Sequence, residues 1–234
     1  KADKRRLLVI AAHIPFFHTR TDRDTFRRED RIRLFKMLEP FRDVLLLTAH
    51  THSQNHVRHG VDTDWHGAGR LHEYNAGAAC GAYWSGHKDQ QGIPDAMMAD
   101  GTPNGYARLD IGADDYRISW FNARQKPNQA MSLSAPKALR KGAYPGFAVY
   151  ANVYMATAGT QVHVRIDDGA WHAMNKVLQA DPKVLQINAQ DNQASPLLSY
   201  DRMPEATASS HLWRYPLPTD LPAGQHVITV RAQD

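Results

Sequence analysis

The sequence contains one cysteine, Cys80, among 234 residues. A single cysteine excludes an internal disulfide and a zinc site built from several thiolates. No segment approaches the roughly 20 consecutive apolar residues that a membrane-spanning helix needs. Basic residues do not alternate with aromatic residues in a known motif, which argues against a nucleic-acid partner. The apolar content of 42% and the charged content of 22% are those of ordinary globular proteins.

The chain also has no secretion signal or initiator methionine at its start, and it ends on a strand-like pattern. We expect both ends to be interior to a longer protein. Residues 1–43 carry twelve Lys or Arg and seven Asp or Glu, an excess of five positive charges. An arginine-rich, solvated helix face explains this excess, and an anionic substrate is also compatible with it.

Thirteen histidines are present, and three of them follow apolar runs. Residues 7–11 are an apolar run followed by His13, and residues 44–48 are a second run followed by His50 and His52. A helical pattern over residues 24–39 separates the two runs, so a crossover would make the two strands parallel. Their carboxyl ends would share one edge of the sheet, where open α/β sheets bind ligands. In an extended chain the side chains of His50 and His52 would point the same way, with their Cα atoms about 6.6 Å apart. Each imidazole could then bind one of two neighbouring metals. The alternative is that these are structural histidines whose ring nitrogens are hydrogen-bonded within the fold.

The rest of the chain is predicted to be mostly β. Strands are expected at 105–111, 116–122, 147–155, 161–166, 170–174, 211–215 and 225–232, whereas residues 180–209 look like a loop. We therefore predict an α+β fold that is mostly β, with a partial strand–helix–strand sheet followed by a sandwich-like β domain. The expected divisions are residues 1–75, a β-rich extension at 76–134, a linker at 135–146 and the accessory domain at 147–234.

Residues 50–75 are rich in histidine and acidic side chains. We interpret this segment as the rim of an active site, with a plain polar loop as the alternative. Glu73, Asn75 and His72 are candidates to orient or flank the metal ligands, because ligand histidines are usually held by hydrogen-bond acceptors. Residues 76–86 are mostly small, which permits close approach of the backbone to a strand or a ligand.

These residues resemble a known family. His13 and the run Ala49-His50-Thr51-His52 resemble the last two metal-binding blocks of calcineurin-like metallophosphoesterases, with Ala49 in place of glycine. The segments 72–75, 80–86, 98–106 and 226–232 are similar to a bacterial subgroup in which a β-rich domain follows the phosphoesterase domain. The resemblance covers nearly all of the chain, but only the C-terminal part of the family architecture.

The resemblance implies that His13 and His50 bind one metal and His52 binds the other. Two divalent ions, Mn, Fe or Zn, would lower the pKa of water and clamp the phosphoryl oxygens. The family's earlier blocks, Asp-x-His, Gly-Asp-x-x-Asp and Gly-Asn-His-Asp/Glu, are not found in the sequence. No Asp or Glu is expected beside the three histidines at a strand end; Asp62, Asp64 and Glu73 are the nearest in sequence. This chain alone is therefore expected to be inactive and to bind metal weakly.

The predicted function is that of the C-terminal portion of a dinuclear metal-dependent phosphoesterase, which hydrolyses a phosphate mono- or diester. The alternative is a carbohydrate-binding or cell-surface-binding β-sandwich with a non-catalytic histidine cluster. Exposed Tyr and Trp clustered on one face of residues 140–234 would favour the alternative. The resemblance also implies a periplasmic or secreted location. We also expect that an uncovered sheet edge could pair with a second copy of the chain and form a homo-oligomer.

Overall fold

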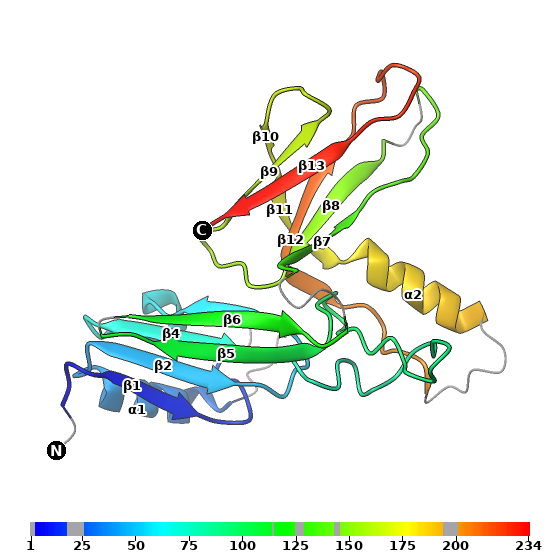
Figure 1. Ribbon diagram of the computed structural model, residues 1–234. Helices are drawn as coiled ribbons and strands as arrows, with labels where there is room; N and C mark the ends of the chain where they lie inside the picture. The colour runs from blue at the N-terminus through cyan, green and yellow to red at the C-terminus, as the bar shows by residue number, and fades with distance from the viewer. Residues whose placement is uncertain (1–2, 18–25, 114, 125–128, 143–145, 194–200) are drawn as a thin grey trace.

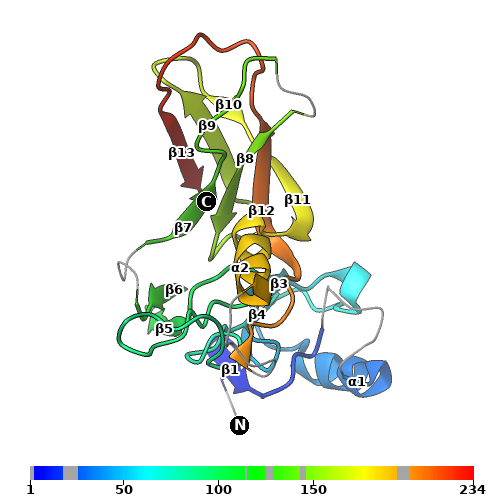
Figure 2. The ribbon, with the colours of Figure 1, turned by 90° about the vertical axis from the view of Figure 1, so that its right-hand side faces the viewer.

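The computed structural model describes residues 3–17, 26–113, 115–124, 129–142, 146–193 and 201–234. The fold is of the α+β class and mostly β, as predicted (Figure 1). A first sheet with its covering elements forms one part of the molecule, and a β-sandwich stands on it (Figures 1 and 2). None of the helices in the described segments is long and apolar enough to cross a membrane.

The first sheet has the spatial order β1-β2-β4-β3. β1 pairs with β2 and β2 pairs with β4 in parallel, whereas β3 runs antiparallel to β4. The parallel β1–β2 pair confirms the strand–helix–strand prediction. The strands are β1 (Leu7–Ala11), β2 (Asp43–Thr48), β3 (Asn55–Arg58) and β4 (Arg70–Asn75), with a short 3₁₀ helix at Val61–Thr63.

One face of this sheet is covered by α1 (Arg28–Leu38). Phe35 and Leu38 on the helix pack against Val44 and Leu46 of β2 and Leu71 of β4. These side chains are at most 4% exposed, so each contributes about 1.5–3 kcal/mol of burial. The helix was expected over residues 24–39, of which 24 and 25 lie outside the described segments. Its apolar face and its position between the two strands agree with the prediction.

The other face is covered by the antiparallel hairpin of β5 (Gly105–Ile111) and β6 (Tyr116–Asn122). The hydroxyl of Tyr116 on the hairpin forms a 2.6 Å hydrogen bond with His72 Nδ1 of β4. Leu45, which points to this side of β2, is fully buried. The central strand is thus covered on both faces, which explains its continuous apolar sequence.

The C-terminal part is a sandwich of two antiparallel sheets with the orders β11-β12-β8-β7 and β10-β9-β13. Val149, Ala151, Val162, Val164 and Trp213 fill the space between the sheets. The strands are β7 (Met131–Ser134), β8 (Ala148–Val153), β9 (Gln161–Ile166), β10 (His172–Ala173), β11 (Asn175–Ala180), β12 (Ala208–Pro216) and β13 (Ile228–Gln233). β7 lies before the linker expected at 135–146, so the sandwich includes a strand from the segment expected to be the extension.

Helix α2 (Pro182–Gln193) lies in a region that was expected to be a loop. Asp181 begins it by accepting the Lys183 N–H at 2.8 Å, and Pro182 occupies the first helical position. Its inner face is largely polar: Asn188 and Asp191 are buried and bind the backbone of residues 203–206. Because these buried positions are polar, the sequence of this segment lacks the apolar periodicity that would predict a helix.

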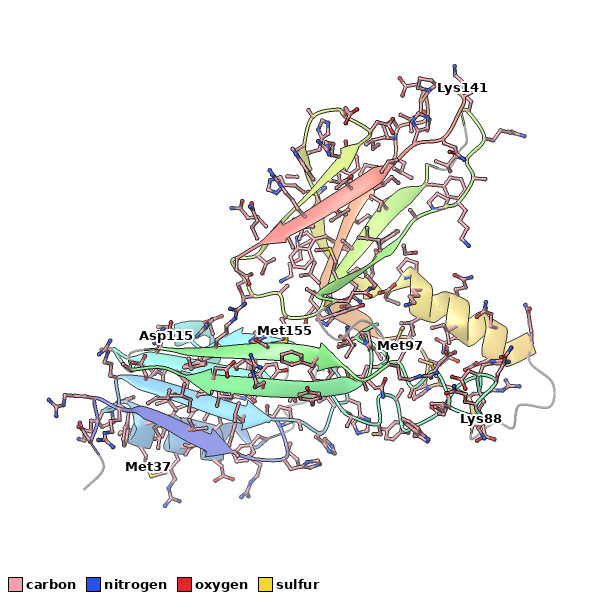
Figure 3. The ribbon with its side chains drawn as sticks, in the orientation of Figure 1. Met37, Lys88, Met97, Asp115, Lys141 and Met155 are labelled. Carbon is pink, nitrogen blue, oxygen red and sulfur yellow. The ribbon has the colours of Figure 1, made fainter. Side chains whose placement is uncertain are left out.

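Asp100 connects the loop after β2 to the sandwich. Its carboxylate accepts hydrogen bonds from the Gln54 N–H at 2.7 Å, the Thr102 N–H at 2.9 Å and His211 Nε2 of β12 at 3.2 Å. Burial opposes ionisation of Asp100, but its contacts with His211 and with these two amides outweigh burial and lower its pKa. Nearby, Tyr74 of β4 donates to Gln54 Oε1 and contacts Met155, which Figure 3 labels at the junction of the two parts.

We expect Asp100→Asn to lower the free energy of unfolding by about 2–3 kcal/mol at pH 7, because an amide cannot accept all of these bonds. A lowered folded pKa stabilises the protein above the ordinary aspartate pKa of about 4, and this stability is lost as the pH falls through the lower folded value. The variant should therefore lose less stability than the wild type between pH 5 and pH 2. Urea unfolding across this range measures both effects.

The matched control is Asp110→Asn, which removes an exposed carboxylate paired with Arg108 and should change stability by less than about 1 kcal/mol. Equal stability of the Asp100→Asn variant and the wild type at pH 7 would contradict this account of the junction.

Candidate functional site

The parallel strands β1 and β2 bring His13 and His50 together. Backbone pairing continues past the strand ends, where the Ala12 N–H donates to Leu47 O at 2.9 Å and the Ala49 N–H to His13 O at 3.1 Å. His13 Nε2 lies 2.9 Å from His50 Nδ1, with one of the two nitrogens carrying the shared proton. The two rings meet edge to face, with centroids 4.8 Å apart. The predicted convergence of these two histidines at one sheet edge is therefore present.

The backbone of His50 and His52 is not extended, contrary to the sequence-based expectation. β2 ends at Thr48, and the chain turns so that His50 has φ 66° and His52 has φ 48°. Both residues lie in the left-handed region, which non-glycine residues seldom adopt. Such conformations cluster at functional sites, where surrounding contacts hold them in place. The turn aims the imidazoles separately: His50 toward His13, and His52 toward the loop at residues 78–86.

His52 is oriented by a backbone carbonyl from that loop. Its Nδ1–H donates to Gly81 O at 2.7 Å, and the ring contacts Tyr83 with centroids 4.6 Å apart. Because Nδ1 carries the hydrogen bond, Nε2 is the ring nitrogen that a metal would bind. Gly81 has φ 57°, and a Cβ there would meet Ala96 O at 1.4 Å, so only glycine fits this position.

Glu73 supports the loop that carries His13. Its side chain is 1% exposed, and its carboxylate accepts from the Phe16 N–H at 2.8 Å, Thr48 Oγ1 at 3.2 Å and His59 Nε2 at 3.0 Å. Phe16 follows His13 by three residues, and Thr48 is the last residue of β2. Glu73 therefore joins the loop after β1 to the end of β2. It does not hydrogen-bond the metal-ligand candidates directly.

Asn75 holds the loop at residues 49–54 from inside. Its Nδ2 donates to Thr51 Oγ1 at 2.6 Å and to Ser53 O at 2.7 Å. Thr51 separates the two histidines, and Thr51 Oγ1 also contacts Ser53 Oγ at 2.8 Å. Asn75 thus acts on the turn between His50 and His52, as a residue that positions the predicted ligands.

His72 lies elsewhere. Its Nε2 meets His56 Nδ1 at 2.9 Å and its Nδ1 meets the Tyr116 hydroxyl at 2.6 Å, so both ring nitrogens are used on the hairpin side of β4. Burial is the main cause that lowers the pKa of His72 to about 2 and that of His56 to about 3. Both rings are therefore neutral at pH 7. The expectation that His72 flanks the three histidines does not agree with these contacts.

Two of the three carboxylates nearest in sequence are engaged by other groups. Asp64 is hydrogen-bonded by Arg28 at 2.7 and 3.0 Å and by Arg31 at 2.9 Å, which holds its pKa well below the usual range. Asp62 is exposed on the short 3₁₀ helix, and Glu73 is engaged as described above. Within the described segments, no three His, Cys, Asp or Glu side chains converge as a metal site.

The His13–His50 pair nevertheless fits part of a metal site. A divalent ion bound about 2.0–2.1 Å from each of two imidazole nitrogens holds those nitrogens about 2.8–3.4 Å apart, for N–metal–N angles between about 90° and the tetrahedral value. The observed 2.9 Å between His13 Nε2 and His50 Nδ1, a hydrogen-bond distance, also lies within that range. His52 lies on the same loop, but its imidazole is turned toward Gly81 and Tyr83 and does not join this pair, contrary to the expectation that all three histidines converge.

Sequence reasoning missed Gly81 and Tyr83 as neighbours of His52. They lie about 30 residues further along the chain, so no local pattern joins them to it. The run of small residues at 76–86 was a usable signal, because it predicted close approach of the backbone to another element or a ligand.

Residues 73–234 match the family model described as the C terminal of calcineurin-like phosphoesterase. Comparisons with curated proteins and with solved structures give no significant match. His13, His50 and His52 precede the matched region, whereas Glu73, Asn75 and Gly81 lie inside it. The match covers more than half of the chain. The chain therefore belongs to the calcineurin-like phosphoesterase family and contains the C-terminal region of that family.

Proposed function

We propose that the chain is the C-terminal portion of a dinuclear metal-dependent phosphoesterase that hydrolyses a phosphate mono- or diester. His13 and His50 would bind one divalent ion and His52 the other. The observation that carries this proposal is the 2.9 Å approach of His13 Nε2 to His50 Nδ1 at the carboxyl ends of two parallel strands. Family membership supports the phosphoesterase chemistry.

The chain's own residues would orient and hold the ligands. Gly81 O fixes the tautomer of His52, Asn75 holds the turn between His50 and His52, and Glu73 ties the His13 loop to β4. Two divalent ions, Mn, Fe or Zn, would supply Lewis acidity that lowers the pKa of water and offsets phosphoryl charge. Three neutral imidazoles do not balance about four positive charges, so acidic ligands from further strands complete the proposed site.

β1 is the place where such strands would add. It is an edge of the sheet in the described part of the chain, and Val9 on it is 37% exposed. An open edge of this kind pairs with another strand, either from the same protein or from a second copy. A complete protein with further strands beside β1 would bring their carboxyl ends next to His13.

The described residues of 140–234 show no exposed cluster of Tyr and Trp of the kind that would favour the binding-module alternative. Within the described part of residues 140–234, the large apolar side chains that are exposed are Phe147, Leu178, Leu185 and Val227, with no Tyr or Trp. Trp213 is buried, and Arg165 and Arg231 lie over the ring of Trp171. The described residues of the sandwich therefore give no observation in favour of carbohydrate binding.

Replacing His13, His50 or His52 with alanine in the complete protein should reduce metal-dependent hydrolysis by more than about 100-fold, because each change removes a ligand. Circular dichroism and thermal unfolding should stay close to those of the wild type. Bound metal, measured by elemental analysis, should fall in parallel with activity. The control is His172→Ala on the exposed strand β10. Equal losses in the control and the three variants would point to destabilisation instead.

Asn75→Ala should weaken metal affinity by about 10- to 100-fold while all three histidines stay in place, because the turn between His50 and His52 loses its internal support. Activity should be recovered at higher metal concentration, which distinguishes a positioning residue from a ligand. Titration of activity with Mn²⁺ measures the shift. An unchanged metal requirement would show that Asn75 does not act on this turn.

This 234-residue chain, purified alone, should hydrolyse a generic phosphodiester no faster than free metal does, because its described residues hold no complete metal site. A form of the protein extended upstream of Lys1 should be active. Assays of the two side by side with Mn²⁺ or Zn²⁺ decide the matter. Matching turnover by the two forms would mean that the site lies elsewhere.

A further inference from the structure

Two exposed aromatic residues, Tyr83 beside His52 and Trp84 next in the chain, have no role in the proposed ligand set. Tyr83 is 70% exposed and Trp84 is 53% exposed. The Tyr83 ring packs against the His52 imidazole with centroids 4.6 Å apart and an interplanar angle of 34°. An exposed aromatic ring packed against a candidate metal ligand is a candidate contact for bound substrate.

The backbone presents these rings in an uncommon way. Gly81, Tyr83 and Trp84 have φ values of 57°, 61° and 58°, all in the left-handed region. Left-handed backbone is rare for aromatic residues, and two in succession are rarer still. The turn is closed by hydrogen bonds from the Trp84 N–H to Cys80 O at 2.8 Å and from the Tyr83 N–H to Gly81 O at 3.1 Å. We call residues 78–86 the aromatic loop.

The aromatic loop is fixed to the rest of the fold at its centre. Ala82, between the glycine and the tyrosine, is 2% exposed and packs against Met97, Val184 of α2 and Met203. Asn104 Nδ2 donates to Ala79 O at 3.0 Å, and Ser85 Oγ donates to Ala82 O. Figure 3 labels Met97 where the loop region meets α2. The buried alanine thus holds the loop from below while the adjacent Tyr83 and Trp84 face solvent.

One loop therefore carries both a contact that orients His52 and a pair of exposed rings. The Gly81 carbonyl sets the tautomer of His52, and Tyr83, two positions later, packs its ring against the same imidazole, with the exposed Trp84 next in the chain. A phosphate ester bound with its phosphoryl group at His52 would have its organic group within reach of these rings. Aromatic faces stack on planar rings, and each such contact contributes measurably to binding.

We propose that Tyr83 and Trp84 form the subsite for the organic group of the phosphate ester, and that this group carries a planar ring such as an aryl group or a nucleobase. The inference rests on the proposed phosphoesterase function and extends it to the substrate class. Tyr83 and Trp84 act on binding of the ring and not on the phosphoryl group. Their removal should change KM and leave kcat nearly unchanged.

The experiment compares ring-bearing esters with ring-free esters of the same linkage in the complete protein. Phenethyl phosphate is paired with butyl phosphate, and adenosine 5′-monophosphate with ribose 5-phosphate; the two pairs distinguish an aryl group from a nucleobase. For Tyr83→Ala and Trp84→Ala, KM for at least one ring-bearing ester should rise about tenfold, corresponding to the loss of one stacking contact. KM for its ring-free partner should not change. Tyr83→Phe keeps the ring and should behave like the wild type.

The matched control is Tyr106→Ala on β5, which removes a tyrosine of similar exposure, 60%, from outside the loop. Equal losses on ring-bearing and ring-free esters, or no change on either, would overturn the assignment. If the wild-type protein turns over neither kind of ester, the phosphoesterase proposal fails by itself. Equilibrium binding of adenosine 5′-monophosphate and ribose 5-phosphate then tests the subsite without turnover. Equal affinity for the two, unaffected by Tyr83→Ala, would overturn it.

Discussion

The buried carboxylate of Glu73 is the point where three segments of the first sheet meet. It accepts hydrogen bonds from the loop after β1, from the last residue of β2 and from His59 after β3. A carboxylate that is 1% exposed is stable in such a place only if donors replace the water it has lost. The ends of β1 and β2 are therefore held at a fixed separation, and the approach of His13 to His50 depends on that separation.

A second buried carboxylate, Asp100, extends this arrangement into the sandwich. It binds the Gln54 amide at the end of the histidine loop and His211 on β12. The loop of His50 and His52 is thus held by Asn75 from the sheet, by Asp100 from the segment before β5 and by Gly81 from the aromatic loop. These three residues lie within the region that matches the family's C-terminal model, whereas the histidines precede it. The C-terminal region therefore takes part in shaping the histidine loop.

Much of this arrangement was predictable from the sequence, and the exceptions share a physical cause. The apolar runs of β1 and β2 and the amphipathic α1 predicted a parallel pair, and parallel strands bring His13 and His50 to one edge. β4 was missed because His72, Glu73 and Asn75 make a buried central strand look like a polar loop. α2 was missed for a similar reason, although Asp181-Pro182 is a usable start signal. Polar side chains satisfied by distant partners cannot be recognised before those partners are known.

The left-handed backbone at His50 and His52 has a consequence for how stability and function are balanced in this loop. A non-glycine residue in this conformation costs about 1–2 kcal/mol, and glycine would avoid most of that cost. Folding alone would therefore favour glycine at both positions, where the sequence has two imidazoles instead. Optimising this protein for thermal stability without regard to its chemistry would tend to remove the very side chains that give the sheet edge its chemical character.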